Sequence, residues 1–141
     1  MKSQNALQTN LNDPMPMLLS KIWVFLSLNY ILCDVLSNME MSVLKMLLEG
    51  NIGGVPMNQG MLLFAGISLE IPFLMVVLSA ILPYKVNRIA SMFAAALMII
   101  YQSASFFFGS DVTLHYMFFS VIEILGNMAI FVLALRWKQA A

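Results

Sequence analysis

The stretch that decides the fold runs from residue 57 to residue 82 and reads MNQGMLLFAGISLEIPFLMVVLSAIL. It contains one charged side chain, Glu70, and a proline lies directly before and directly after it. A helix that crosses a membrane needs about 20 consecutive, mostly apolar residues. The stretch therefore predicts a transmembrane helix that ends at its flanking prolines.

Three further stretches have the same character: residues 17–38, 88–108 and 112–135. The first follows a polar leader over residues 1–16, and it is too long for the apolar core of a signal peptide and has no small-residue cleavage site after it. None of the four alternates with a period of two, which argues against a membrane barrel. The sequence predicts an all-α fold, a polytopic four-helix bundle that forms a single membrane domain over residues 1–141.

The composition supports this class. Of the 141 residues, 61% are hydrophobic and only 10% are charged, whereas soluble domains carry about a quarter charged residues. A net charge of zero gives no reason to expect a nucleic-acid partner. The apolar composition makes membrane lipids the expected surroundings. The single cysteine, Cys33, excludes an intramolecular disulfide and a cysteine-based metal cluster. The methionines lack a repeated metal-binding spacing, and no nucleotide or dinucleotide motif occurs, so neither metal nor cofactor is expected.

The distribution of Lys and Arg predicts the orientation. Cytoplasmic loops carry an excess of these residues. In the predicted topology only Lys45 lies on one side of the membrane, and the other six lie together on the opposite side: Lys2, Lys21, Lys85, Arg88, Arg136 and Lys138. Both termini are therefore expected in the cytoplasm.

The connection over residues 39–56 is more than a plain loop. Apolar residues at three- and four-residue spacing lie beside Lys45 and Glu49, and three glycines follow. This pattern is typical of a short amphipathic helix in the outer interface of the membrane. It either caps the bundle or moves as a lid.

Polar side chains inside the spans are the candidate functional residues. An ionisable group at membrane depth costs about 2.5–3.5 kcal/mol by insertion scales, so each one needs an explanation. At about 1.5 Å per residue, Glu123 lies roughly 13 Å and Glu70 roughly 20 Å from the outer ends of their helices. We expect both to bind a ligand or a proton in a pocket that opens outward, with Asp34, Gln102 and Asn127 as polar neighbours. No catalytic residue is assigned.

Structural roles compete with this interpretation. Burial disfavours the charged form of a carboxyl, so Glu123 could serve as a neutral hydrogen-bond donor to Asn127 or Gln102. Pro72 disturbs the backbone hydrogen bonds around Glu70, which either creates a small site or only kinks the helix for packing. Small residues over 90–105 suit close helix packing within the bundle or a dimer face.

Three functions follow as hypotheses. The leading one is a non-enzymatic protein that binds, and in one version transports, an unknown small molecule or a proton. A chain this short would be expected to form a homodimer if it transports. The second is an intramembrane enzyme that acts on a lipid or sterol-like substrate with paired carboxyls as acid and base. The third is an accessory subunit of a larger membrane complex.

Several strings carry a family resemblance. They are Leu69-Glu70-Ile71-Pro72, Leu82-Pro83-Tyr84-Lys85-Val86-Asn87-Arg88, Tyr116-Met117-Phe118-Phe119, Ile122-Glu123-Ile124 and Asp34-Val35-Leu36-Ser37. By these strings the chain resembles an uncharacterised bacterial family of small four-helix membrane proteins, and its layout is similar to the DoxX-like group. The resemblance implies the bacterial inner (plasma) membrane as its location and implies no activity.

Overall fold

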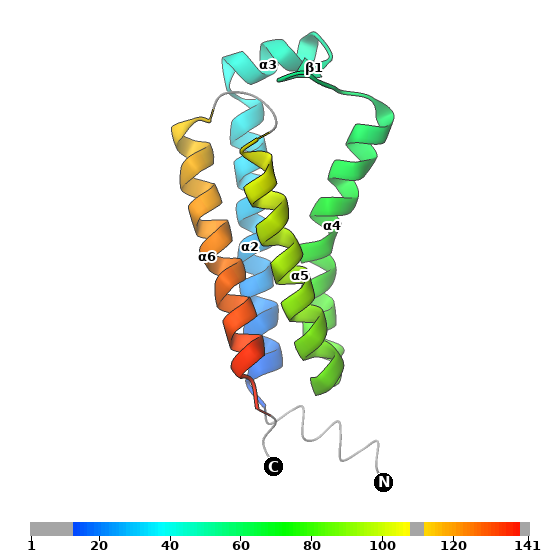
Figure 1. Ribbon diagram of the computed structural model, residues 1–141, viewed down its shortest axis with the longest axis vertical. Coiled ribbons are helices and arrows are strands. Elements are labelled where there is room, and N and C mark those ends of the chain that lie inside the picture. Colours follow the sequence, from blue (N-terminus) through cyan, green and yellow to red (C-terminus); the bar gives the residue numbers. More distant parts are fainter. Residues whose placement is uncertain (1–12, 108–111, 139–141) are drawn as a thin grey trace.

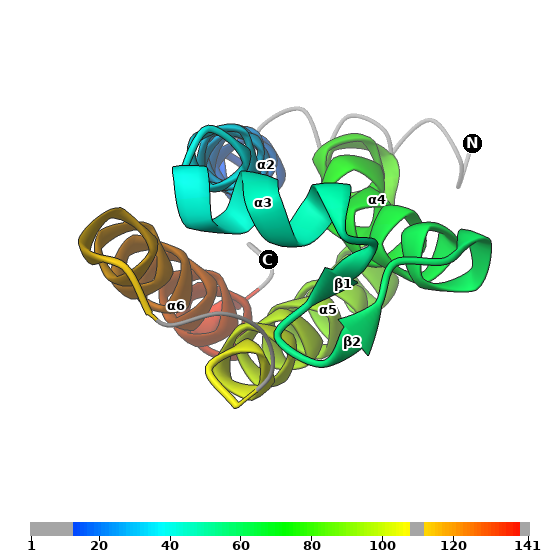
Figure 2. The same cartoon turned by 90° about the horizontal axis from the view of Figure 1, so that it is seen from above.

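The computed structural model describes residues 13–107 and 112–138. Within these ranges the chain forms five helices and one short hairpin. The helices are α2 (Met15–Asn38), α3 (Met41–Leu48), α4 (Gln59–Ile81), α5 (Tyr84–Ser105) and α6 (Leu114–Arg136). Four of them, α2, α4, α5 and α6, lie side by side, and α3 lies across one end of this bundle (Figures 1 and 2). We call this end the α3 end and the opposite end, where α2 begins and α6 finishes, the basic end.

Local capping decides where the long helices begin. The side chain of Asn58 accepts a hydrogen bond from the amide of Met61 at 2.9 Å, and Thr113 caps α6 in the same way. Such caps satisfy amide groups that have no partner within the helix. The third helix begins at Tyr84 and not at the predicted residue 88, because Pro83 has a φ of −66° and suits the position before the first turn. Residues 1–12 of the predicted leader, with Lys2, and residue 108 of the third span lie outside the described residues.

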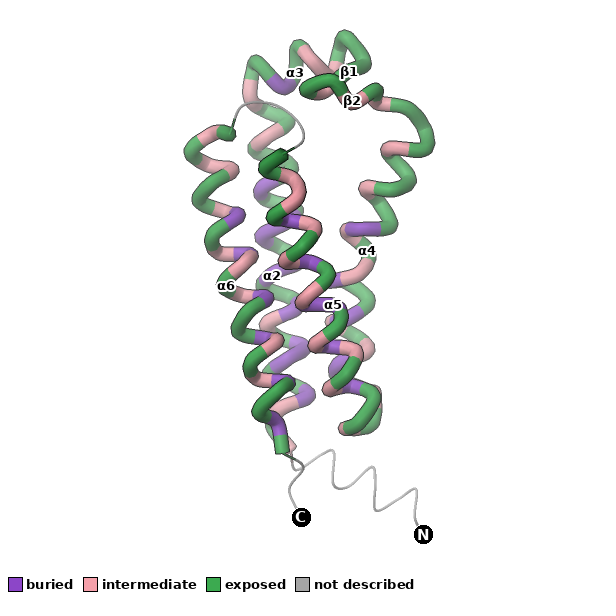
Figure 3. Tube along the Cα trace, viewed as in Figure 1, coloured by how far each residue is buried: buried purple, intermediate pink, exposed green. Residues whose placement is uncertain are grey.

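Three helices, α2, α4 and α6, are long and apolar enough to cross a membrane, which indicates an integral membrane protein. Exposed positions run along each of these helices (Figure 3), and many of them carry large apolar side chains. Lipid tails accept such a surface, whereas water would not. With 22 residues, α5 is nearly as long, but Lys85, Asn87, Arg88 and Gln102 lower its mean hydropathy.

The connection between α2 and α4 contains the helix α3 and, after it, a hairpin of strands β1 (Asn51–Ile52) and β2 (Val55–Pro56). Gly53 and Gly54 form its turn with φ values of +55° and +88°, which only glycine adopts freely. The hairpin was not predicted, because the glycines were interpreted only as the end of a helix. A two-residue turn that needs two positive φ angles is the signal that was missed.

The helices do not pack equally. Along the bundle, α2 packs against α4 and α6, and α5 packs against α6, while α4 and α5 meet over a much shorter length. The part of α4 nearest α3 leans away from the other helices in both views and is mostly exposed (Figures 1 to 3). Pro72 lies inside α4 at the point below this part, where the missing amide hydrogen bond allows a helix to bend.

The half of the bundle near the basic end is closely packed. Its apolar core includes Leu19, Trp23 and Leu26 of α2 and Ile130 of α6, none of which is exposed. Gly126 lies against this core, since a Cβ atom there would come within 2.5 Å of the Leu26 side chain. Several buried polar side chains in this half are bonded within the protein, as Asn87 is to the backbone oxygen of Ser79 and to Ser91.

Hydrogen bonds close the basic end. Arg88 donates from Nε to the carbonyl oxygen of Ala134 at 2.9 Å and from Nη2 to that of Leu135 at 2.8 Å. Tyr84 donates its hydroxyl to the carbonyl oxygen of Trp137 at 2.8 Å. The last carbonyl groups of a helix have no partner within it, and a cation there also interacts favourably with the helix dipole. Residues 82–88 therefore hold the end of α6, which gives this string a structural role.

Replacing Arg88 with Ala should lower the free energy of unfolding by about 1.5–3 kcal/mol, because two carbonyl oxygens lose a charged donor. The measurement is denaturant unfolding of the purified protein in detergent, with Lys85→Ala as the control. Lys85 is an exposed cation one turn away in the same helix, and its side chain forms no hydrogen bond with the residues that the structure describes. Equal losses of stability in the two variants would contradict the role given to Arg88.

Candidate functional site

A cavity of about 150 Å³ lies between the four long helices, in the half of the bundle nearer α3. The up-and-down course of the chain brings the later turns of α2 and α5 beside the earlier turns of α4 and α6 (Figure 1). Each of these four helices therefore contributes to the wall. The lining residues are Tyr30, Cys33, Asp34, Ala65, Leu69, Tyr101, Gln102, Ser105, Tyr116 and Glu123.

Glu123 of α6 is the most unusual group in this wall. The residue is only 1% exposed, and neither carboxyl oxygen has a hydrogen-bond partner among the described residues. Buried polar groups in proteins are nearly always paired, because an unpaired one forfeits its hydration without compensation. A carboxyl that lines a cavity in this condition is available to whatever enters the cavity.

The neighbouring amides are engaged elsewhere. Asn127 donates from Nδ2 to the hydroxyl of Tyr30 at 2.8 Å and to the backbone oxygen of Glu123 at 2.8 Å, while its Oδ1 has no partner. Gln102 donates from Nε2 to the hydroxyl of Ser120 at 2.6 Å. These two amides are the partners that a structural role for the Glu123 carboxyl would require. In the structure each joins two helices by one bond, and neither is bonded to that carboxyl.

Hydroxyl groups fasten the wall between α5 and α6. Ser105 donates to the backbone oxygen of Gln102 at 2.6 Å and also forms a hydrogen bond with the hydroxyl of Tyr116. Together with the bond from Gln102 to Ser120, these contacts fix two successive turns of α5 against α6. The polar lining is thus held in place by hydrogen bonds that do not involve Glu123.

Asp34 of α2 lines the cavity too, but its residue surface is exposed, so it lies where the cavity opens. Nearby, the hydroxyl of Ser37 and Nε2 of His115 are 3.2 Å apart and link α2 to α6. The cavity therefore has one buried carboxyl and one at its opening. Among residues 13–107 and 112–138, no three His, Cys, Asp or Glu side chains gather in a way that could hold a metal ion.

Glu70 does not join this group. It is exposed on α4, and the residues by which α4 lines the cavity are Ala65 and Leu69. The buried residues of α4 recur at helical spacing from Ser68 to Pro72 and onward, and position 70 lies between them on the other side of the helix. The expected pairing of Glu70 with Glu123 is therefore not found. The sequence allowed the depth of Glu70 along its helix to be inferred, but not the direction in which its side chain points around the helix axis.

Of the five predicted site residues, the structure brings Asp34, Gln102 and Glu123 together in the wall, with Asn127 one turn behind Glu123. Sequence reasoning did not assign the tyrosines that share this wall, Tyr30, Tyr101 and Tyr116. A signal was present for one of them, because Tyr30 lies one helical turn before Asp34 and must share its face.

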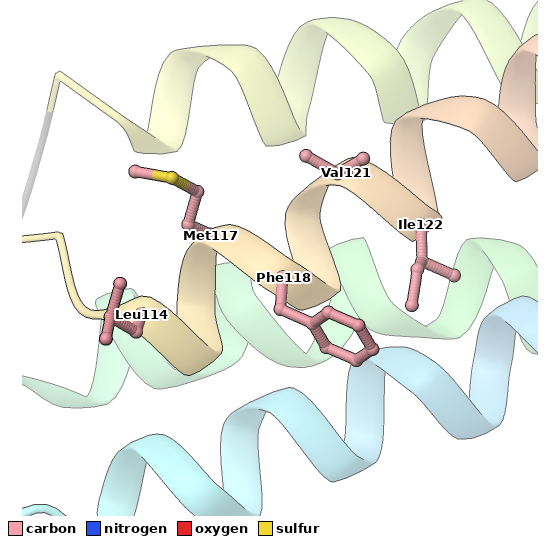
Figure 4. Close-up of a pocket in the computed structure, with 5 residues that line it drawn as sticks. All are labelled: Leu114, Met117, Phe118, Val121 and Ile122. Atoms are coloured by element: carbon pink, nitrogen blue, oxygen red, sulfur yellow. The ribbon is translucent and has the colours of Figure 1, made fainter.

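A second hollow, about 350 Å³, lies on the outside of α6. Its five lining residues are all apolar and belong to this one helix: Leu114, Met117, Phe118, Val121 and Ile122 (Figure 4). Ligand sites combine apolar walls with a few polar groups that orient the ligand. No side chain in this lining can do so, and the hollow is typical of a surface that faces lipid tails.

Because the Glu123 carboxyl has no partner, Glu123→Leu should not destabilise the protein and should raise its free energy of unfolding by about 1–3 kcal/mol. Gln102→Leu, the matched control in the same wall, should lower it by about 1 kcal/mol through loss of the bond to Ser120. Both are measured by denaturant unfolding in detergent. A clear loss of stability in Glu123→Leu would show that this carboxyl has a structural partner.

Comparison with known proteins yields one match. The model of a family of unknown function, DUF6326, matches residues 10–141. No curated protein and no solved structure matches the chain. The match confirms the expectation of an uncharacterised family, while the DoxX-like layout and the bacterial origin stay predictions. Because the family model covers nearly the whole sequence, the chain belongs to the family of unknown function DUF6326.

Proposed function

We propose that this protein crosses the membrane four times and binds a small polar molecule, or a proton, in the cavity between its helices. The observation that carries the proposal is the Glu123 carboxyl, which is buried in the cavity wall and has no partner among the described residues. Ionisable residues within membrane spans usually serve a pathway, a proton relay or a ligand, because their burial is costly. A bound ligand or proton would offset the cost of burying the Glu123 carboxyl, which the described residues do not offset.

The fourth span in this proposal is α5. Its 22 residues reach from the basic end to the α3 end, as those of the three more apolar helices do. Its polar residues have local explanations, since Arg88 bonds the end of α6 and Gln102 bonds Ser120. Packing against α6 along its length covers these groups from lipid.

The basic end is proposed to lie in the cytoplasm. Of the Lys and Arg residues that the structure describes, only Lys45 lies at the α3 end, and the others lie at the basic end: Lys21, Lys85, Arg88, Arg136 and Lys138. Positive residues near span ends are retained on the cytoplasmic side. The cavity then opens toward the outer side near Asp34, and α3 lies in the outer interface.

Binding from the outer side is favoured over transport. The half of the bundle between the cavity and the cytoplasm is filled by the core around Trp23 and closed by the bonds of Arg88 and Tyr84. Such a cavity could also serve transport, but transport would require this half of the bundle to open.

An enzymatic role is the second candidate. The specific observation in its favour is that two carboxyls, Asp34 and Glu123, line one cavity, as an acid and base pair must. Under this alternative Asp34, and not Glu70, would be the second carboxyl. Conversion of a lipid by the purified protein, lost in Glu123→Gln, would support it over binding alone.

Native mass spectrometry of gently extracted protein tests the binding function. Wild type should retain a small molecule that Glu123→Gln loses, because the substitution removes the free carboxyl while keeping its shape. Glu70→Gln is the matched control, since it neutralises a carboxyl on the exposed side of α4. Retention by Glu123→Gln equal to wild type, or no retained molecule in any sample, would contradict the proposal.

A further inference from the structure

We propose that the ligand of the cavity is a small organic cation with N–H groups, a protonated amine on a short hydrocarbon body. The inference rests on the proposed binding function and names the chemistry of its ligand. It follows from the unpartnered atoms, the charge, the aromatic lining and the size of the cavity.

The unpartnered atoms at this site are all acceptors. They are the two carboxyl oxygens of Glu123 and Oδ1 of Asn127. Both amide hydrogens of Asn127 are used, by the hydroxyl of Tyr30 and the backbone oxygen of Glu123, and Nε2 of Gln102 bonds Ser120. A ligand that completes the site must therefore bring donors, and an ammonium group has three of them and no acceptor.

The charge of the wall also selects a cation. Asp34 and Glu123 line the cavity, and no Lys, Arg or His is among its lining residues. An anionic ligand would find no cationic side chain among these lining residues to pair with. A positively charged group instead gains charge-assisted hydrogen bonds, which are about twice as strong as neutral ones.

The remainder of the lining suits the other parts of such a ligand. Three tyrosine rings, of Tyr30, Tyr101 and Tyr116, come from three different helices, and a cation near the face of an aromatic ring is attracted by it. Ala65 and Leu69 of α4 provide an apolar side for a hydrocarbon body. Charge, donors and a short apolar part are thus accommodated together.

The volume limits the size of the ligand. A cavity of about 150 Å³ has the space of about five water molecules at roughly 30 Å³ each. Sites for drug-sized ligands are about 300–1,000 Å³, so a cavity of this volume favours a smaller ligand.

The test is calorimetric titration of the full chain in lipid nanodiscs with three probes. Propylammonium chloride carries both the charge and the donors, tetramethylammonium chloride carries the charge alone, and 1-propanol resembles the first in shape but is neutral. Propylammonium should bind at least about tenfold more tightly than tetramethylammonium, since charged hydrogen bonds contribute about 1.5–3 kcal/mol. Propanol should show no binding.

Variants locate the binding. Glu123→Gln should weaken propylammonium binding at least about tenfold, and Asp34→Asn, at the exposed opening, should weaken it by a smaller factor. Glu70→Gln should leave it unchanged. If Glu123→Gln does not fold by circular dichroism, Asp34→Asn decides, and unchanged binding in that variant overturns the proposal.

The outcomes separate this inference from the binding function on which it rests. If propylammonium does not bind while native mass spectrometry finds a retained molecule without an amine, the ligand class is wrong and the binding function stands. If no probe binds and no molecule is retained, both fail. Equal binding of propylammonium by wild type and Glu123→Gln would also overturn the inference.

Discussion

Polar groups within a membrane need partners inside the protein, and most of this structure follows from that requirement. Hydroxyls inside the helices bond to their own backbone, as Ser27 does to the carbonyl of Trp23 and Ser68 to that of Phe64. The end of α6 is satisfied by Arg88. Glu123 departs from this pattern with a whole carboxyl group, which is as deeply buried as the core and lacks a partner among the described residues.

The requirement divides the bundle into two halves with different tasks. Near the basic end, Leu19, Trp23 and Ile130 pack without exposed surface, and the bonds at residues 82–88 tie α5 to α6. Nearer α3, the wall is polar, the cavity lies between the helices and α4 leans away. Stability is thus supplied by one half, which allows the other to keep an unsatisfied carboxyl. Proteins commonly accept such a local cost where function requires it.

Glu70 and Glu123 are similar in sequence context but differ in their position relative to the cavity. Both are carboxyls near the middle of apolar helices, and the sequence alone gives them equal weight. In the structure one faces a cavity with other polar groups, and the other is exposed on α4. Only the first has neighbours with which it could hold a ligand, which makes the second a suitable control and not a partner.

The sequence by itself determined the elements. Long apolar runs predicted helices that cross a membrane, and the depth of Glu123 followed from its distance to the helix end. The start of the third helix was predicted four residues too late, since Pro83 allows it to begin at Tyr84. The tertiary structure decided which side chains share the cavity. The physical reason is that a helix surrounded by lipid lacks the polar outer stripe that reveals the buried face of a soluble helix, so one polar residue such as Glu70 does not show which way it faces. The rotation of each helix, and with it the separation of Glu70 from Glu123, is set only when the helices pack.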